Sequence, residues 1–466
     1  MRLITGGTTF GQARNASRRR QSQGVLLSLL LLVAACGESG SPNPQDRADG
    51  ISPRKAGIAD FLRGGTIFAG VAADESRAAE VGRDVLLGGG NAVDAAVAMY
   101  FAQAVTLPSA SSLGASGACI VHNYKTRVGE LFGFAPMAAP GPIGGVSFTV
   151  PAGVRAITLM HIRHGQARWE FLIAPAERLA RFGVPVSRAL ARDLQVGAGT
   201  LGADREARRT FSKGPAGAAT STAVTEGDNW SQPDLAGTLG GLRQYGGADF
   251  FSGRLARLLS DQVAQAGGSL PLESLRNTVP QSGAPSSEAF GSYRVYVAPA
   301  PFAGATALAG WNGRAAPTGG AASDSGGFAG FIAVDSTGTA AACTMSMGQL
   351  FGARIVVPGT GILLGAPTPD AAAVSPLVIA SANNGEFLFA GAGGGSSSAA
   401  ASVGAVARAT IQRSEPVPRA LAERAGQSGH VDAIACPRGL RGNVISCSGA
   451  TDPAGSGLAL PAIPNR

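Results

Sequence analysis

The sequence has few of the residues that build metal, redox or nucleic-acid sites. Among 466 residues there are five cysteines and four histidines, and charged residues make up only 15%. No CxxC pair and no cluster of histidine with cysteine occurs, so we expect no metal and no cofactor. No run of lysine and arginine with interleaved aromatic residues occurs either, so we expect no nucleic-acid partner.

Two of the histidines, His161 and His164, have the i, i+3 spacing of one helix face. A pair at such spacing is one way of holding a metal ion. Arg163 and the polar residues around it favour another interpretation, in which both histidines lie at a solvated helix end. We expect the solvated helix end.

Long apolar runs are also missing near the start of the chain. The run Val25–Ala35 has eleven residues, whereas a transmembrane helix needs about twenty. It follows Arg14 and Arg18–Arg20, and small residues lead directly to Cys36. This arrangement resembles a bacterial lipoprotein signal, in which Cys36 is lipidated and begins the mature chain. The alternative is an ordinary cleaved signal with an incidental cysteine.

These features divide the chain into three parts. Residues 1–36 are the expected lipoprotein signal segment, and residues 37–64 form a flexible tether rich in Pro, Gly and Ser. Residues 65–466 form a single domain. Residues 1–35 contain five arginines and no acidic residue, so their removal lowers the formal net charge from +8 to +3. We expect the protein to be exported to the periplasmic face of a membrane, with Cys36 as its lipid anchor.

The composition of the remainder is that of a globular protein with a large core. Hydrophobic residues make up 45% of the chain, and its 68 glycines are about twice the usual share. Asn91 has the position of a helix N-cap, with Asp94 placed for a capping box. Segment Thr306–Gly327 has the composition of a flexible loop.

Helical runs lie beside strand pairs, which suits helices packed over a sheet sandwich. The expected helices are Glu75–Leu87, Ala92–Val105, Gly153–His164, Trp169–Phe182, Asp234–Tyr245 and Asp249–Ala264. The expected strands are Gly65–Ala73, Ala118–His122, Arg127–Gly133, Tyr293–Ala298, Phe328–Asp335 and Thr339–Ser346.

The cysteines after Cys36 fall into two groups. Cys436 and Cys447 flank a short loop and are candidates for a disulfide in an oxidising compartment. Cys119 and Cys343 lie in apolar, strand-like runs, and we expect them to be buried free thiols.

Several motifs in a fixed order resemble the γ-glutamyltransferase family. The quoted stretches are Gly88–Val105, Gly165–Arg192, Glu226–Leu239 (EGDNWSQPDLAGTL), Gly291–Gly304, Ser323–Asp370 and Gly391–Ala400. Members of this family are N-terminal-nucleophile hydrolases, which cut themselves before a threonine that then serves as nucleophile. The resemblance implies an α+β fold, a four-layer αββα sandwich. It divides the domain into a large-subunit-like part, 65–327, and a small-subunit-like part, 328–466.

At the site, the resemblance places phenylalanine where the nucleophile is expected. The family's T-T-H-F-S-V-V-D segment falls on Phe328–Asp335, so Phe328 takes the position of the catalytic threonine. Phenylalanine has no nucleophilic atom, so no catalytic residue of the family is intact. Ser325 is a rescue candidate only if the strand start shifts, and its alternative is a loop serine.

The substrate pocket is altered as well. The clamp arginine corresponds to Ala135, and both substrate-binding serines correspond to Ala372 and Ala373. What remains is the pair Gly394 and Gly395 as oxyanion-hole candidates. Asp370 and Ser346 remain as substrate-binding candidates. The alternative is that the glycines serve only close packing and that Asp370 only begins a turn.

Two function classes follow from this sequence. The first is an exported γ-glutamyltransferase-like enzyme, which hydrolyses or transfers a γ-glutamyl group from a glutathione-like ligand, impaired by its replaced residues. The second is a non-catalytic, lipid-anchored protein of the same fold that binds a ligand or acts as a scaffold. Family membership argues for the first class, and the side chains at the site argue for the second.

Overall fold

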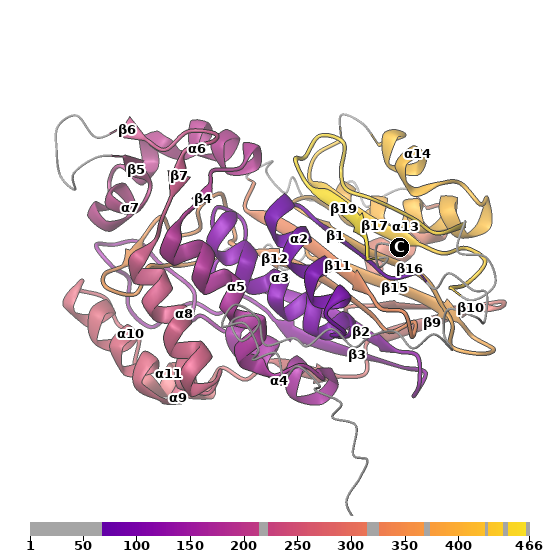
Figure 1. The fold of residues 1–466 in the computed structure, drawn as a ribbon, viewed down its shortest axis with the longest axis horizontal. Helices are drawn as coiled ribbons and strands as arrows, with labels where there is room; N and C mark the ends of the chain where they lie inside the picture. Colours follow the sequence, from indigo (N-terminus) through magenta and orange to yellow (C-terminus); the bar gives the residue numbers. More distant parts are fainter. Residues whose placement is uncertain are drawn as a thin grey trace, which may run out of the picture. The chain divides into compact units, whose positions relative to one another are not determined.

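The computed structural model describes residues 68–213, 222–314, 326–367, 373–424, 427–440 and 446–462. Two antiparallel sheets form the centre of this part of the chain (Figure 1). The larger has seven strands in the order β19-β1-β11-β12-β2-β3-β8, and the smaller has six in the order β18-β17-β16-β15-β10-β9. Three further strand pairs are β4–β7, β5–β6 and β13–β14.

The strands have the following bounds. The seven-stranded sheet contains β1 Gly70–Ala73, β2 Ser116–Asn123, β3 Val128–Phe134, β8 Gln281–Gly283, β11 Phe328–Val334, β12 Ala340–Ser346 and β19 Leu458–Pro461. The six-stranded sheet contains β9 Ser286–Phe290, β10 Tyr293–Val297, β15 Ser375–Ser381, β16 Phe387–Gly394, β17 His430–Ala435 and β18 Ser448–Ala450. The short strands are β4 Val184–Pro185, β5 Ser212–Lys213, β6 Thr222–Ala223, β7 Asn229–Trp230, β13 Val356–Val357 and β14 Ile362–Leu363.

The helices of the described residues lie between the first and the last of these strands in the chain. They are α2 Ser76–Leu87, α3 Ala92–Thr106, α4 Gly153–His164, α5 Trp169–Phe182, α6 Arg188–Leu201, α7 Arg205–Thr210, α8 Pro233–Tyr245, α9 Asp249–Ser252, α10 Arg254–Gln265, α11 Leu272–Asn277, α12 Gly304–Trp311, α13 Ser397–Gln412 and α14 Val417–Ala422. No helix of the described residues is long and apolar enough to cross a membrane.

Three hydrophobic cores hold four layers together. One core joins α2, α3, α5 and α8 to the outer face of the larger sheet, and includes Phe331. The second lies between the two sheets and includes Phe328 and Ile332. The third joins α12 and α13 to the smaller sheet. Successive side chains of β11 thus enter different layers, as strand geometry requires. The αββα sandwich expected from the sequence is confirmed.

The buried helix α3 begins as the sequence predicts. The Asn91 side chain accepts a hydrogen bond from the Asp94 amide at 2.9 Å, and the Asp94 carboxylate accepts one from the Asn91 amide at 2.9 Å. All fifteen residues of α3 are buried. Asp335, at the end of β11, accepts a hydrogen bond from the Ala92 amide at 3.1 Å. This contact joins the start of the helix to the central sheet.

Two helix predictions require correction. The predicted helix Asp249–Ala264 is two helices, because the Asp249 carboxylate accepts the Arg254 amide at 2.6 Å and so begins α10 anew after Gly253. The predicted loop Thr306–Gly327 contains most of α12, whose Ala- and Leu-rich residues pack on α13. Residues 315–325 lie outside the described part.

For His161 and His164 the expected helix end is confirmed, but the expected solvation is wrong. Both residues are in the last turn of α4, but each side chain is only 15% exposed. His164 Nε2 lies 2.7 Å from Glu130 Oε2, and His161 Nε2 lies 2.9 Å from the carbonyl oxygen of Ala167. The sequence around α4 is polar, but Glu130 of β3 contacts His164 and helps to shield it from solvent.

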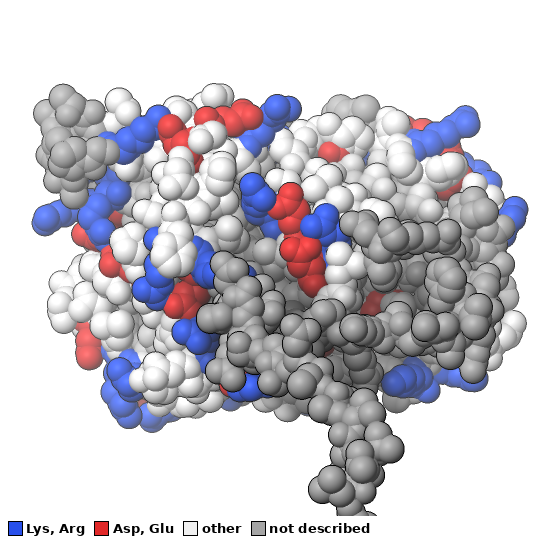
Figure 2. Space-filling model, viewed as in Figure 1, with Lys and Arg blue, Asp and Glu red and all other residues white. Residues whose placement is uncertain are grey.

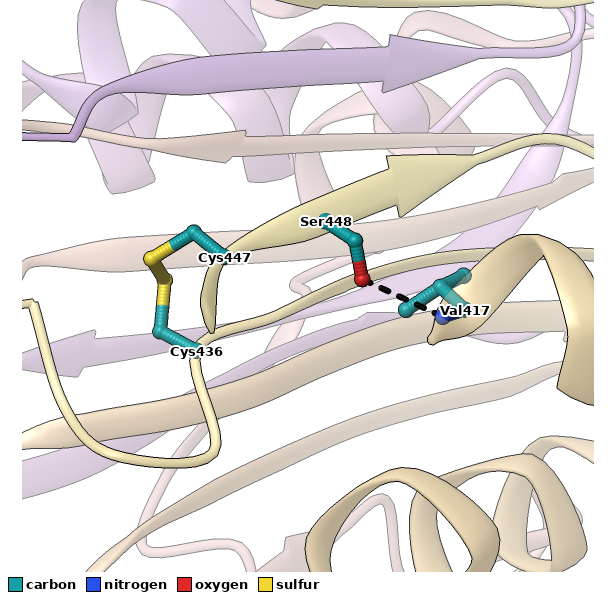
Figure 3. The surroundings of a disulfide bond; sticks show 4 residues. All are labelled: Val417, Cys436, Cys447 and Ser448. Atoms are coloured by element: carbon teal, nitrogen blue, oxygen red, sulfur yellow. Dashed lines mark hydrogen bonds between the residues drawn. A yellow bond between two sulfur atoms is a disulfide. The ribbon is translucent and has the colours of Figure 1, made fainter. Parts of the chain in front are cut away.

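The cysteines form two disulfides. Cys436 and Cys447 are bonded, as predicted, and close the segment before β18 (Figure 3). The Ser448 hydroxyl beside this bond accepts a hydrogen bond from the Val417 amide at 3.1 Å, which ties β18 to α14. The expectation of free thiols at Cys119 and Cys343 is wrong. They face each other on neighbouring strands β2 and β12, with Cα atoms 4.1 Å apart, and form a disulfide.

The contact between α12 and α13 depends on glycine. A Cβ atom on Gly404 would overlap the carbonyl oxygen of Ala307 and lie 2.6 Å from the Trp311 amide nitrogen. We predict that Gly404→Ala lowers the free energy of unfolding by about 1–3 kcal/mol, as overpacking does. Gly237→Ala in α8 is the control, because no atom lies within 4 Å of its Cβ position. Alanine there should be neutral or stabilising by up to about 1 kcal/mol. Equal urea-unfolding curves for both variants would contradict the close packing.

Candidate functional site

Phe328 begins β11 and is buried between the two sheets, with 5% of its surface exposed. It is paired with Ser346 across the β11–β12 ladder. The ladder continues one step upstream, since the Met347 amide donates to the Gly327 carbonyl oxygen at 2.8 Å. A Cβ atom on Gly327 would collide with the backbone of Gln349. The peptide before Phe328 is therefore held inside the sheet structure.

The ring of Phe328 lies against the two glycines that the resemblance names as oxyanion-hole candidates. A Cβ atom on Gly394 would lie 3.2 Å from Cδ1 of Phe328, and one on Gly395 would lie 3.7 Å from Cδ2. Gly395 has φ +96°, a conformation that favours glycine. The two glycines thus meet an aromatic ring, and the packing role considered for them has a physical basis here.

Ser346, a predicted substrate-binding residue, has a structural contact in the fold. Its side chain is buried, and its hydroxyl oxygen accepts a hydrogen bond from the Gly348 amide at 2.9 Å. Its carbonyl oxygen accepts a hydrogen bond from the Ser116 hydroxyl at 3.1 Å. The hydroxyl of Ser346 therefore helps to shape the turn after β12.

Other predicted residues lie partly outside the described part of the chain. Asp370, Ser325, Ala372 and Cys36 fall on residues that the structure does not describe. Ala135 directly follows β3 and packs at the edge of the core between the sheets. Ala373 is buried in the same core. The two described positions that replace polar substrate contacts are thus part of the apolar layer.

Sequence reasoning missed two ionisable residues beside Phe328. Asp74, which follows β1, accepts the Gly330 amide at 2.7 Å through Oδ2. Its other oxygen, Oδ1, lies 3.7 Å from Nδ1 of His430, the first residue of β17. These residues are hundreds of positions apart in the chain, so no local motif could reveal them. They come together because β1 pairs with β11, and β17 of the other sheet packs against β11, an arrangement that only the fold supplies.

Among the residues that the structure describes, a small cavity adjoins Phe328. Its volume is about 30 Å³, and it is lined by Asp74, Leu107, Ala110, Ala189, Arg192, Asp193, Gly326, Gly327, Phe328, His430, Gly455 and Ser456. Burial raises the pKa of Asp193, although the Ser109 hydroxyl donates to its carboxylate at 2.6 Å. A space of this size holds about one water molecule, whereas ligand pockets usually measure about 300–1,000 Å³.

Deeper in the same region, a carboxyl group is fully buried. Asp432 on β17 is 1% exposed, and its Oδ2 has no hydrogen-bond partner among the described residues. Arg424 is paired instead with Asp452, whose amide donates to Asp432 Oδ1 at 3.2 Å. Burial raises the pKa of Asp432 well above its usual range, and the charge of Asp74 adds to this, while Arg424 opposes it.

Because of this environment, we expect the ionisation of Asp432 to lower the stability of the fold. A carboxyl with a raised pKa binds its proton more tightly in the folded state, so stability falls as pH rises from about 4 toward the folded pKa. We predict that Asp432→Asn, which is neutral at every pH, has a Tm near that of the parent at pH 4 and a higher Tm at pH 8. Asp261→Asn on the exposed face of α10 is the control. It should leave the difference in Tm between pH 4 and pH 8 the same as in the parent. A lower Tm for Asp432→Asn at pH 8 would contradict this account.

Charged side chains of both signs are interspersed on the face of the molecule that Figure 2 shows. Among the described residues, no group of three or more His, Cys, Asp or Glu is arranged to hold a metal ion.

Comparison with known proteins places these observations in a family. The family model described as Gamma-glutamyltranspeptidase matches residues 78–314, about half of the chain. The chain is 30% identical to Glutathione hydrolase 3 of Arabidopsis thaliana over 284 residues, covering 56% of this chain and 44% of that protein. It is 30% identical to the Glutathione hydrolase proenzyme of Escherichia coli over 252 residues, covering 50% and 42%.

The fold has a solved counterpart. The structure of cephalosporin acylase from Bacillus halodurans superposes with a TM-score of 0.69 at 19% identity, covering 85% of this chain and 96% of that one. At that identity the likeness concerns the fold alone. The chain spans less than half the length of the curated relatives it matches here, and the family match ends before Phe328. The motifs, the αββα fold and the family match agree, and the chain belongs to the γ-glutamyltranspeptidase family.

Proposed function

We propose that this protein is an exported, catalytically impaired member of the family, which does not cleave itself. The observation that carries the proposal is Phe328 at the start of β11, where the resemblance expects the threonine nucleophile. Self-cleavage and acyl transfer both need a side-chain oxygen that attacks a carbonyl carbon. A benzyl side chain offers no such atom.

The family's reaction, as the resemblance implies it, breaks the amide bond of a γ-glutamyl compound and passes the acyl group to water or an amine. The substrate's carboxylate would need a cationic clamp. The methyl group of Ala135, at the position of the clamp arginine, cannot replace a guanidinium group. The ring of Phe328 against Gly394 further opposes an oxyanion there, because it fills the space that a tetrahedral centre would need.

A non-catalytic role, as a ligand-binding protein or a scaffold of the same fold, has a specific observation in its favour. The cavity of about 30 Å³ at Phe328 is far smaller than a γ-glutamyl group requires. A ligand of γ-glutamyl size would then need a site other than the space that the described residues leave at Phe328.

We also propose that the protein is attached to the periplasmic face of a bacterial membrane by a lipid on Cys36. The sequence from Arg14 to Cys36 supports this location through its charged, apolar and small-residue segments. The disulfides Cys119–Cys343 and Cys436–Cys447 support it independently, because disulfides persist in oxidising compartments.

The proposal predicts that the purified protein and its Ser325→Ala variant both release p-nitroaniline from γ-glutamyl-p-nitroanilide only at the rate measured without protein. Ser325 is the one rescue nucleophile that the sequence offered, so this variant is the matched control. A released product that disappears in Ser325→Ala would establish a shifted active site and overturn the proposal. Turnover that persists in the variant would overturn it too, since another nucleophile would then operate.

A further inference from the structure

A second cavity lies away from Phe328 and shares no lining residue with the small cavity there. Its volume is about 360 Å³, within the usual range for sites that bind small molecules. It is lined by Arg209, Thr210, Ser212, Lys213, Val224, Asp228, Asn229, Trp230, Ser231, Gln232, Pro233, Asp234, Leu235 and Gly361. Most of these residues belong to the end of α7, the β5–β6 pair, β7 and the first turn of α8, which lie together in Figure 1.

The inner wall of this cavity is apolar and fixed. Trp230 is 3% exposed, and its indole nitrogen donates to the Thr210 carbonyl oxygen at 2.7 Å. Val224 and Trp230 belong to the same hydrophobic cluster, and Leu235 is buried beside them in the lining. The Gln232 side chain donates to the Val105 carbonyl oxygen at 2.8 Å and anchors the start of α8. These side chains fix the shape of the inner wall and present a small apolar surface to a ligand.

The remainder of the lining carries two charges of each sign. Lys213 forms an ion pair with Asp228 and donates to the Thr225 hydroxyl at 3.0 Å. Arg209 forms an ion pair with Asp234 and a second one with Glu206 at 2.7 Å. The hydrogen bond from Lys213 is the main cause that lowers the pKa of Asp228 to about 2, so this carboxylate is ionised at neutral pH.

These pairs can exchange partners. The side chains of Lys213 and Asp228 are 41% and 29% exposed, and those of Arg209 and Asp234 are 35% and 31% exposed. Ion pairs this exposed contribute little to stability, so replacing one partner costs little. A ligand with a carboxylate alone would pair with a lysine or arginine and leave the displaced aspartate without a cation. A ligand with an ammonium group as well supplies that cation, so both protein charges keep a partner of opposite sign.

We propose that this cavity binds a small zwitterion with an apolar centre, of the size of an amino acid or short peptide. Its carboxylate contacts Lys213, its ammonium group contacts Asp228, and its apolar part lies on the wall formed with Trp230. The site uses the segment EGDNWSQPDL, which the candidate site at Phe328 does not involve.

The probe is the tripeptide Gly-Leu-Gly, titrated calorimetrically into the purified protein at low salt. Its N-acetyl and C-terminal amide forms each lack one charge, and we expect each to bind at least about tenfold more weakly. Lys213→Gln should weaken the free tripeptide at least about tenfold, with no further loss for the amide form. Asp228→Asn should weaken the free tripeptide similarly, with no further loss for the N-acetyl form.

Arg188→Gln is the matched control. Arg188 forms an exposed ion pair with Glu226 in the same region and does not line the cavity. It should leave the affinity unchanged, and all three variants should keep the parent's Tm within a few degrees. Three results would overturn the proposal: no binding up to about 10 mM tripeptide, equal binding of free and capped peptides, or equal affinity of Lys213→Gln and Arg188→Gln.

Discussion

The burial of β11 between two packed layers is the constraint on which the site depends. All seven of its residues are buried, and its side chains alternate between the helix layer and the space between the sheets. Phe328, the first of them, must therefore fill interior volume. A residue that reacts with substrate needs open space at this position, and a residue that completes the core needs the opposite. Here the aromatic ring meets Gly394, and the cavity that remains holds about one water molecule.

The charged residues around this strand fit the same picture. Asp74 accepts the Gly330 amide of β11, and Asp432 faces the same glycine from the other sheet. Such groups would normally be costly in an apolar layer unless they were paired or protonated. Arg424 is paired with Asp452, and burial keeps Asp432 in its protonated form over a wider pH range. The structure thus keeps polar groups beside Gly330 of β11, two residues after Phe328.

Much of the fold could be predicted from the sequence, because local signals and layer packing agree. Asn91 and Asp94 marked the start of α3, and the predicted strands Phe328–Asp335 and Thr339–Ser346 correspond to the β11–β12 hairpin. In its turn the Asp335 amide donates to the Thr339 carbonyl oxygen at 3.0 Å. The errors concern contacts between distant segments. Cys119 and Cys343 pair because of the register of β2 and β12. His164 contacts Glu130 because α4 packs against β3. At the candidate site, the chain position of Phe328 was accessible to sequence reasoning, whereas Asp74 and His430 were not.

The central claim is that the chain stays intact at Phe328, and the intact mass of the purified protein after prolonged incubation tests it most directly. We expect a single species with the mass of the uncut chain, because the Gly327 carbonyl is held by the Met347 amide and no hydroxyl follows it. Two fragments, with a new N-terminus within residues 323–328, would reveal a working nucleophile. Such a result would contradict the account and restore the self-cleaving enzyme as the better description.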